Sequence, residues 1–107
     1  MSKSTASRVL TARDDFGNVV ITLNRPEVHN AFDPEMVRAL TATLAGIAAD
    51  DSIRAVVISG AGKSFCAGAD IGRFVDMLGD APASAQYARD CSRLLVHLDQ
   101  MKKPVVA

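Results

Sequence analysis

The sequence AVVISGAGKSFCAGADI occupies residues 55–71, and more than any other stretch it decides the fold. Its first five residues, 55–59, have the length and composition of a strand, and their nearly continuous apolar character predicts burial on both faces. Gly60 and Gly62 end the strand, a loop follows, and Asp70 is expected to open a short helix. A buried strand that leads through a glycine-rich loop into a helix is typical of an α/β fold.

A β-hairpin is expected upstream of this stretch. Residues 8–13 alternate weakly between polar and apolar, and residues 19–23 are rich in β-branched side chains. The segment between them contains the turn formers Asp15, Gly17 and Asn18. The next segment, 24–27, breaks the second strand, and Pro26 also disfavours helix at Arg25.

Two amphipathic helices complete the pattern. The first is expected at about residues 34–49, where Asp33 is suited to the N-cap and Pro34 to the first helical position. The second is expected at about residues 84–101, after a break at 79–82. Its predicted buried face consists of Tyr87, Cys91, Leu94, Leu95 and Leu98, and Lys102 and Lys103 suit its C-terminal end. Residues 104–107 read as the start of a buried strand, which gives the order ββ-α-β-α-β.

Composition excludes several classes of protein. The chain has 107 residues, 49% of them apolar, with 12 basic and 12 acidic side chains. A neutral chain has no general attraction for nucleic acid or anionic membrane, and no apolar run reaches the roughly 20 residues of a membrane span. Residues 1–7 lack the apolar core of a secretory signal, and we expect them to be disordered. The two separate cysteines form no metal or redox motif, so a reducing, cytoplasmic setting is expected.

Three other motifs are incomplete. Gly62-Lys63-Ser64 resembles the end of a phosphate-binding loop, but the first glycine of that loop would fall at Val57. Phe65 stands where the third glycine of a dinucleotide-binding fingerprint belongs. Cys66 could act as a nucleophile, although a small buried role is more usual. His29 and His97 are too far apart, with no third ligand, to predict a metal site, and His29 could either touch a ligand or remain solvated.

The loop around Gly68 has the composition of a site where a ligand approaches the backbone. Ala67, Gly68 and Ala69 keep side chains out of the way, and Asp70 is expected to cap the helix rather than act as a base. The amide of Ala69 would then lie near a helix N-terminus, which favours developing negative charge. A plain strand-to-helix turn packed with small residues explains this composition equally well.

Three ordered segments resemble the enoyl-CoA hydratase/isomerase (crotonase) family. Asn24-Arg25-Pro26-Glu27 followed by Asn30-Ala31-Phe32 is similar to the first family signature. The stretch from Gly60 to Ile71 is similar to the second, Gly-x-Gly-x-x-Phe-[Ser/Cys/Ala]-Ala-Gly-x-Asp-[Leu/Ile]. The last five residues, 103–107, are similar to the start of the next family strand.

The resemblance implies a spiral of repeated ββα turns, of which residues 1–107 would supply the first turns as the truncated N-terminal part of a crotonase-like domain. It implies an acyl-CoA thioester substrate, with no separate cofactor and no metal, and a lyase that most often hydrates 2-enoyl-CoA through an enolate-like intermediate. The Ala69 amide maps onto one of two oxyanion-hole donors. The implied substrate-binding residues are Val28, Ala31, Ala67, Gly68, Ala69, Asp70 and Ile71. Arg25 and Lys63 are the nearest basic residues for the CoA phosphates, and a solvated role fits each equally well.

In the family, the second oxyanion amide and the catalytic carboxylates follow the strand that begins at residue 104. Glu27 and Glu35 match neither role, so we expect the 107 residues alone to be inactive. The resemblance also implies a homo-oligomer, a trimer or a dimer of trimers, for the full-length enzyme. The alternative from another class is a non-catalytic CoA-binding or interaction module that ends at residue 107. Hydration, double-bond shift, decarboxylation and thioester hydrolysis remain open as reactions.

Overall fold

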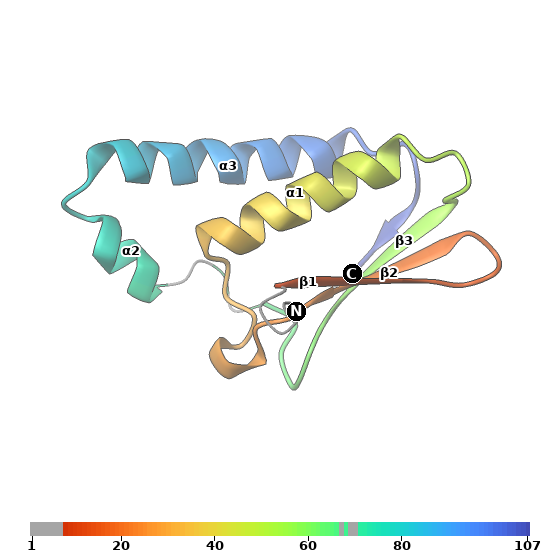
Figure 1. Ribbon diagram of the computed structural model, residues 1–107, viewed down its shortest axis with the longest axis horizontal. Coiled ribbons are helices and arrows are strands. Elements are labelled where there is room, and N and C mark those ends of the chain that lie inside the picture. Colours follow the sequence, from red (N-terminus) through yellow and green to blue (C-terminus); the bar gives the residue numbers. More distant parts are fainter. Residues whose placement is uncertain (1–7, 67, 69–70) are drawn as a thin grey trace, which may run out of the picture.

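A computed structural model describes residues 8–66, 68 and 71–107. Four strands form one sheet in the order β1-β2-β3-β4 (Figure 1). Strands β1 (Val9–Arg13) and β2 (Asn18–Leu23) pair antiparallel, which confirms the predicted hairpin. Strands β3 (Ala55–Gly60) and β4 (Val105–Val106) are added in turn, each parallel to its neighbour. The mixed α/β class and the order of the elements are therefore as predicted.

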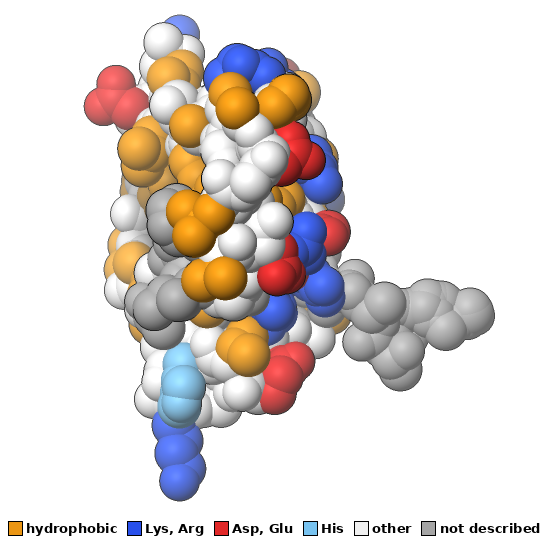
Figure 2. All heavy atoms as spheres, turned by 90° about the vertical axis from the view of Figure 1, so that its left-hand side faces the viewer, with side chains coloured by type: hydrophobic (Ala, Val, Ile, Leu, Met, Phe, Trp, Pro, Cys, Tyr) orange, Lys and Arg blue, Asp and Glu red, His pale blue; other side chains and the backbone are white. Residues whose placement is uncertain are grey.

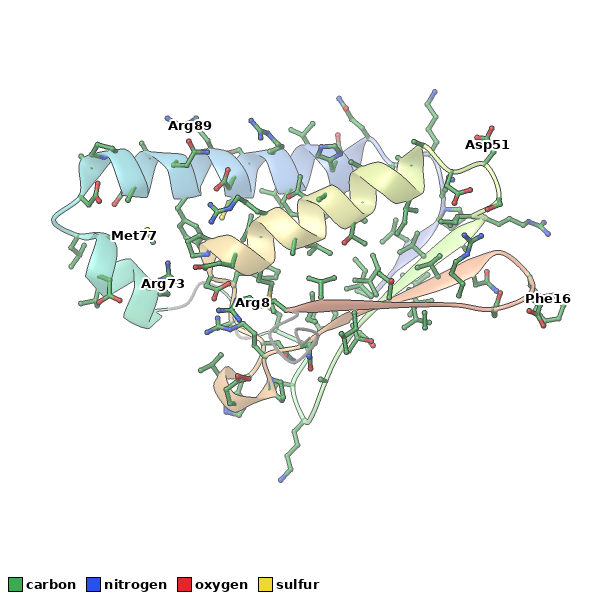
Figure 3. The ribbon with its side chains drawn as sticks, viewed as in Figure 1. Arg8, Phe16, Asp51, Arg73, Met77 and Arg89 are labelled. Carbon is green, nitrogen blue, oxygen red and sulfur yellow. The ribbon has the colours of Figure 1, made fainter. Side chains whose placement is uncertain are left out.

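Local chemistry explains the hairpin turn. The Asp14 carboxylate accepts hydrogen bonds from the backbone N–H groups of Phe16 and Asn18, at 2.8 and 3.0 Å. Gly17 has a φ of 88°, a conformation that costs glycine little. These hydrogen bonds, with one from the Asn18 side chain, hold the pKa of Asp14 below its ordinary value. Phe16 projects into solvent at the tip of the turn (Figure 3).

Helix α1 (Pro34–Ala48) begins as its sequence predicts. Asp33 is the N-cap, and its side chain accepts a hydrogen bond from the N–H of Met36 at 2.8 Å. A short 3-10 helix, η2 (Pro26–Val28), precedes it, and α2 (Ile71–Met77) follows the loop after β3. The long helix α3 (Ala81–Asp99) starts three residues earlier than predicted. The prediction was wrong because Pro82 lies in the first turn, where proline is tolerated, and Asp80 caps it through the N–H of Ala83.

The core lies between the sheet and the helices α1 and α3, which cover one of its faces (Figure 1). The inward side chains of the two longest neighbouring strands and of both helices are almost fully buried: Val19, Ile21, Leu23, Val56, Met36, Val37, Leu44 and Leu94. The predicted burial of β3 on both faces is wrong for the described chain, since Val57 is 38% exposed on the side away from the helices. Leu95, predicted to be on the buried face of α3, is also exposed.

Lys103 connects the end of the chain to α1. Its ammonium group donates hydrogen bonds to the backbone oxygens of Ile47, at 2.8 Å, and of Asp50, at 2.5 Å. It therefore binds the carbonyl groups at the C-terminal end of α1, and not those of α3 as the sequence predicted. The side chain lies beside the negative end of the α1 dipole, which favours a positive charge.

Candidate functional site at the carboxyl ends of the parallel strands

The loops that follow β2 and β3 leave the sheet at the same edge. In sheets with parallel strands, ligands bind outside the carboxyl ends of those strands, so this edge is the first place to look for a site. The N–H of Ala61 donates to the carbonyl of Leu23 at 2.9 Å, which joins the two loops where they begin. The first loop runs over residues 24–33 and contains the first sequence signature, and the second loop begins at residue 61, within the second signature.

Asn30 ties these two loops together. Its side chain is fully buried, and its amide nitrogen donates to the carbonyls of Ala61 and Ser64 at 2.9 and 2.7 Å. Its side-chain oxygen accepts from the N–H of Arg25 at 2.7 Å. The residue has a φ of 58°, which asparagine tolerates better than most residues. The Asn30 side-chain amide thus provides hydrogen bonds that water would otherwise make to backbone groups of both loops.

Two glycines allow the loops to approach each other. A Cβ on Gly60 would overlap the carbonyl oxygens of Ser64 and Phe65. A Cβ on Gly62, whose φ is 78°, would lie 3.0 Å from the Cβ of Pro26 in the other loop. Both glycines belong to the second sequence signature, and the structure requires them for close packing of the backbone.

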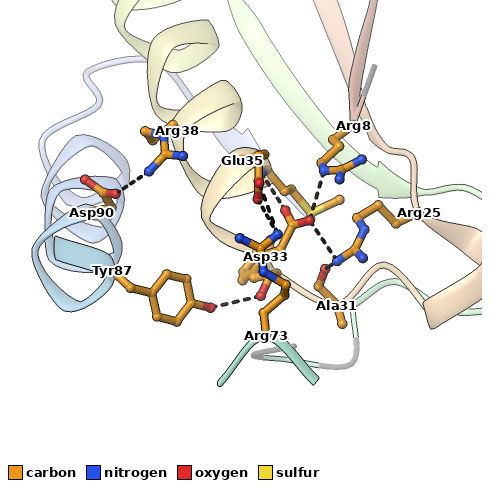
Figure 4. Close-up of polar contacts among 11 residues, drawn as sticks. Arg8, Arg25, Ala31, Asp33, Glu35, Arg38, Arg73, Tyr87 and Asp90 are labelled. Atoms are coloured by element: carbon orange, nitrogen blue, oxygen red, sulfur yellow. Dashed lines mark hydrogen bonds and ion pairs between the residues drawn. The ribbon is translucent and has the colours of Figure 1, made fainter. Parts of the chain in front are cut away.

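Asp33 is the charged anchor of the first loop. Its side chain is 1% exposed, and Oδ2 lies 2.9 Å from Nε of Arg8 and 3.3 Å from Nη1 of Arg25 (Figure 4). Within the described part of the chain, neither Arg8 Nε nor Asp33 Oδ2 makes a hydrogen bond, so charge attraction holds that contact. A carboxylate this deeply buried requires such partners.

This arrangement bears on the role of Arg25. Its side chain is 13% exposed, and Nη1 also donates to the carbonyl of Ala31 at 2.8 Å. The Arg25 guanidinium is therefore bound by groups of its own loop, Asp33 and the carbonyl of Ala31. Lys63 is exposed, and no ion pair is found for it within residues 8–66, 68 and 71–107.

Gly68 lies against the end of the first loop. Its carbonyl accepts from the N–H of Phe32 at 2.7 Å, and the Phe32 carbonyl accepts from the Tyr87 hydroxyl at 2.9 Å. The φ of Gly68 is 97°, and a Cβ added there would face open space. A residue with another side chain would be strained at this position, while the backbone itself is accessible.

The structure describes some of the predicted binding residues and not others. Val28, Ala31 and Gly68 belong to the joined loops, with Ala31 buried, Val28 half-buried and Gly68 exposed. Ala67, Ala69 and Asp70 lie outside the described residues, and Ile71 is the first residue of α2. His29 is exposed, and its Nδ1 is 3.0 Å from the Ser64 hydroxyl, which adds a further polar contact between the loops.

An apolar hollow of about 270 Å³ lies beside Phe32. It is lined by Phe32, Tyr87, Cys91, Leu94 and Leu95. Burial raises the pKa of the Cys91 thiol, and the nearby Asp90 charge acts in the same direction although a hydrogen bond with Tyr87 opposes both. Cys91 is therefore a neutral thiol at physiological pH and behaves as a small apolar side chain.

The described part of the chain contains no group of three or more His, Cys, Asp or Glu side chains placed to hold a metal ion. Nor does it contain a helix long and apolar enough to cross a bilayer.

The sequence did not predict two parts of the site, the buried amide of Asn30 and the hydroxyl of Tyr87. The positive φ that asparagine tolerates was a usable signal for the first, but nothing local connects Tyr87 with Phe32, 55 residues away.

Known proteins share this sequence pattern. The family model described as enoyl-CoA hydratase/isomerase matches residues 18–107. A 1,2-epoxyphenylacetyl-CoA isomerase from Escherichia coli is 40% identical over 92 residues, which are 84% of this chain and 35% of the relative. An (E)-benzylidenesuccinyl-CoA hydratase from Thauera aromatica is 41% identical over 92 residues, which are 81% of this chain and 33% of the relative. The chain thus spans about a third of the length of these curated relatives.

Solved structures share the fold. Pseudomonas aeruginosa AtuE superposes with a TM-score of 0.86 at 34% identity, covering 92% of this chain and 38% of that one. An enoyl-CoA hydratase from Mycobacterium smegmatis superposes with a TM-score of 0.83 at 33% identity, with the same coverage. These matches place the sheet, α1 and α3 within a crotonase fold.

Proposed function

Because the chain belongs to the enoyl-CoA hydratase/isomerase family, we propose that it supplies the first half of a site for an acyl-CoA thioester. The observation that carries this proposal is the junction of the two loops through Asn30 and through the Phe32–Gly68 hydrogen bond. It brings the backbone of Ala31 and that of Gly68 to one edge of the sheet. Such a backbone-lined edge suits a ligand that is recognised through main-chain groups.

In this proposal the Ala69 amide donates to the thioester oxygen. As a bond forms at the β-carbon, electrons move toward that oxygen, and a fixed N–H stabilises the negative charge of the resulting enolate. One such donor typically contributes about 10²–10³ in kcat. A Cβ added to Gly68 would meet no atom within 4 Å, which supports room for the thioester beside the backbone there.

The remaining predicted residues would bind the CoA portion. We assign Val28, Ala31, Ala67, Gly68, Asp70 and Ile71 to that pocket, following the family resemblance. Of the two basic candidates, the structure favours Lys63 for the CoA phosphates, because its ammonium is exposed whereas Arg25 is engaged with Asp33 and Ala31. CoA enters as part of the substrate, so this scheme has no separate cofactor.

Hydration of a 2-enoyl-CoA is the reaction we propose. Water adds its oxygen to the β-carbon, and the α-carbon takes up a proton as the enolate collapses. By resemblance, the acid–base carboxylates and the second oxyanion amide belong to family segments beyond residue 107. Positioned acid–base groups contribute about 10²–10⁴ in rate, so the 107 residues should not catalyse hydration by themselves.

The test compares the full natural reading frame that contains these residues with the 107-residue chain. Loss of the conjugated-thioester absorbance of crotonyl-CoA is followed at equal protein concentration, with heat-killed protein as the control. The proposal predicts turnover by the full frame and none by the short chain. A full frame that binds the thioester without consuming it would favour the non-catalytic module, and turnover by the short chain would place a catalytic carboxylate within residues 1–107.

A further inference from the structure

The backbone N–H groups of the first loop are already bound from residue 28 to residue 32. Each of these five N–H groups donates to a carbonyl of the described chain, at N···O distances of 2.7–3.2 Å. The acceptors are the carbonyls of Arg25, Pro26, Val28 and Gly68. An anionic group of a ligand that lies against this part of the loop must therefore be bound by side chains.

Three arginines around the two loops already have carboxylate partners. Arg8 and Arg25 lie against the buried carboxylate of Asp33, at 2.9 and 3.3 Å. Arg73 lies against Glu35, at 3.0 Å. A guanidinium whose charge is already paired offers less to a second anion, so these three are poor candidates for binding a phosphate.

Two other basic side chains are open to solvent where the loops meet. Within residues 24–33 and 61–66, the exposed basic residues are His29 in the first loop and Lys63 in the second. Lys63 is next to Ser64, whose hydroxyl lies 3.0 Å from His29 Nδ1, so the two basic residues belong to one small area. Figure 2 shows a His side chain beside a Lys or Arg side chain at the lower end of the molecule, the height at which these loops lie in Figure 1.

The contact with Ser64 decides which ring nitrogen of His29 can meet a ligand. Nδ1 faces the hydroxyl, so Nε2 is the nitrogen left for a ligand. A hydroxyl that donates to Nδ1 keeps the hydrogen of a neutral imidazole on Nε2, and the protonated ring carries hydrogen on both nitrogens. Nε2 is then a donor in both forms, and the oxygens of a phosphate group are acceptors.

We propose that His29 and Lys63 together bind a phosphate group of the CoA portion, with the Ser64 hydroxyl orienting the imidazole. This inference rests on the proposed function, because CoA is what brings phosphate groups to this edge of the sheet. It makes His29 a residue that determines affinity for the nucleotide part of the substrate. Each exposed charge contributes modestly, so the two side chains act together.

The experiment measures the dissociation constants of CoA, dephospho-CoA and pantetheine for the full natural reading frame by isothermal titration calorimetry, with pantetheine titrated to millimolar concentration. The variants are His29→Asn, His29→Lys, Lys63→Gln and the double variant His29→Asn/Lys63→Gln. Asparagine is chosen at position 29 because it tolerates the φ of 53° found there. His97→Asn and Lys102→Gln are the matched controls, since these residues lie in and just after the last turn of α3, away from the two loops (Figure 1). Thermal midpoints serve as the control for folding.

We expect His29→Asn and Lys63→Gln each to weaken CoA binding by about 3- to 5-fold, and the double variant to weaken it by about 10- to 25-fold. His29→Lys should bind CoA as the parent does, because it keeps a cationic donor at position 29. Both controls should match the parent with CoA. Every variant should match the parent with pantetheine, which has no phosphate group.

The two sources of phosphate in CoA are separated by dephospho-CoA, which lacks the 3′-phosphate. Losses that persist with dephospho-CoA assign the diphosphate to His29 and Lys63, and losses that disappear assign the 3′-phosphate. A double variant that binds CoA as tightly as a CoA-binding parent overturns the phosphate site and leaves the proposed function standing. Equal losses with CoA and pantetheine also overturn it, because the effect would then not depend on phosphate. A parent that binds no CoA overturns the proposed function, and this inference with it.

Discussion

At the carboxyl ends of β2 and β3 the loops are joined through Asn30 and the first loop is anchored by Asp33, and both side chains are fully buried. At the opposite ends, the turns are built on Asp14 and Asp50, whose carboxylates make hydrogen bonds of similar length at the surface. Water can replace a lost partner at the surface, but it cannot do so in the interior. The hydrogen bonds of the candidate site should therefore contribute far more to stability than those of the hairpin end.

The two helix caps offer the largest contrast. Asp33→Ala removes a cap and leaves Arg25, with Arg8, without its carboxylate, so we expect a loss of about 4 kcal/mol in the free energy of unfolding. Asp80→Ala removes the exposed cap of α3 and should cost about 1 kcal/mol. Denaturant titration of the full natural reading frame measures both. Equal losses would mean that burial does not distinguish the two caps as described.

Asn30 and Asn18 allow the same comparison of buried and surface hydrogen bonds for neutral side chains. Asn30→Ala leaves the carbonyls of Ala61 and Ser64 and the N–H of Arg25, all in half-buried residues, without the Asn30 amide, and we expect it to cost about 3 kcal/mol. Asn18→Ala removes one surface hydrogen bond to Asp14 and should cost about 0.5 kcal/mol. Denaturant titration of the full natural reading frame measures both losses. A small effect at Asn30 would show that the loops stay joined without its amide.

Alanine substitution at two glycines should change the stability of the protein in opposite directions. Gly60→Ala drives a methyl group into the backbone of residues 64 and 65, so we expect a loss of about 2–3 kcal/mol. Gly46→Ala places its methyl group in open space within α1 and should stabilise the protein by about 0.5–1 kcal/mol. Thermal unfolding midpoints should move in opposite directions. Destabilisation by Gly46→Ala would indicate a contact that the structure lacks.

The sequence predicted best those elements that carry their own start and stop signals. The hairpin followed from the turn residues around Gly17, and α1 followed from Asp33 and Pro34. The start of α3 was misplaced because proline breaks a helix in its interior but not in its first turn, and the two cases look alike in sequence. Burial of β3 was overestimated because an apolar run does not reveal how many layers cover it.

The candidate site was predicted as two motifs, but not as one assembly. The signatures indicated which loops matter, while the contacts that join them link residues more than 30 positions apart, such as Asn30 with Ser64. Arg25 was offered as a basic residue for phosphate, and only its partners Asp33 and Ala31 reveal that it is turned inward. Long-range partners of this kind leave no local signal in one sequence.

The central claim is that the loop carrying Ala69 presents a backbone amide to a thioester oxygen. Ala69→Pro removes that N–H, and Ala69→Ser keeps it with a small change of side chain. For the full natural reading frame acting on crotonyl-CoA, we predict that Ala69→Pro lowers kcat by about 10²–10³ and that Ala69→Ser stays within about 10-fold of the parent. Circular dichroism of both variants serves as the control for folding. Two folded variants with equal activity would contradict the assignment.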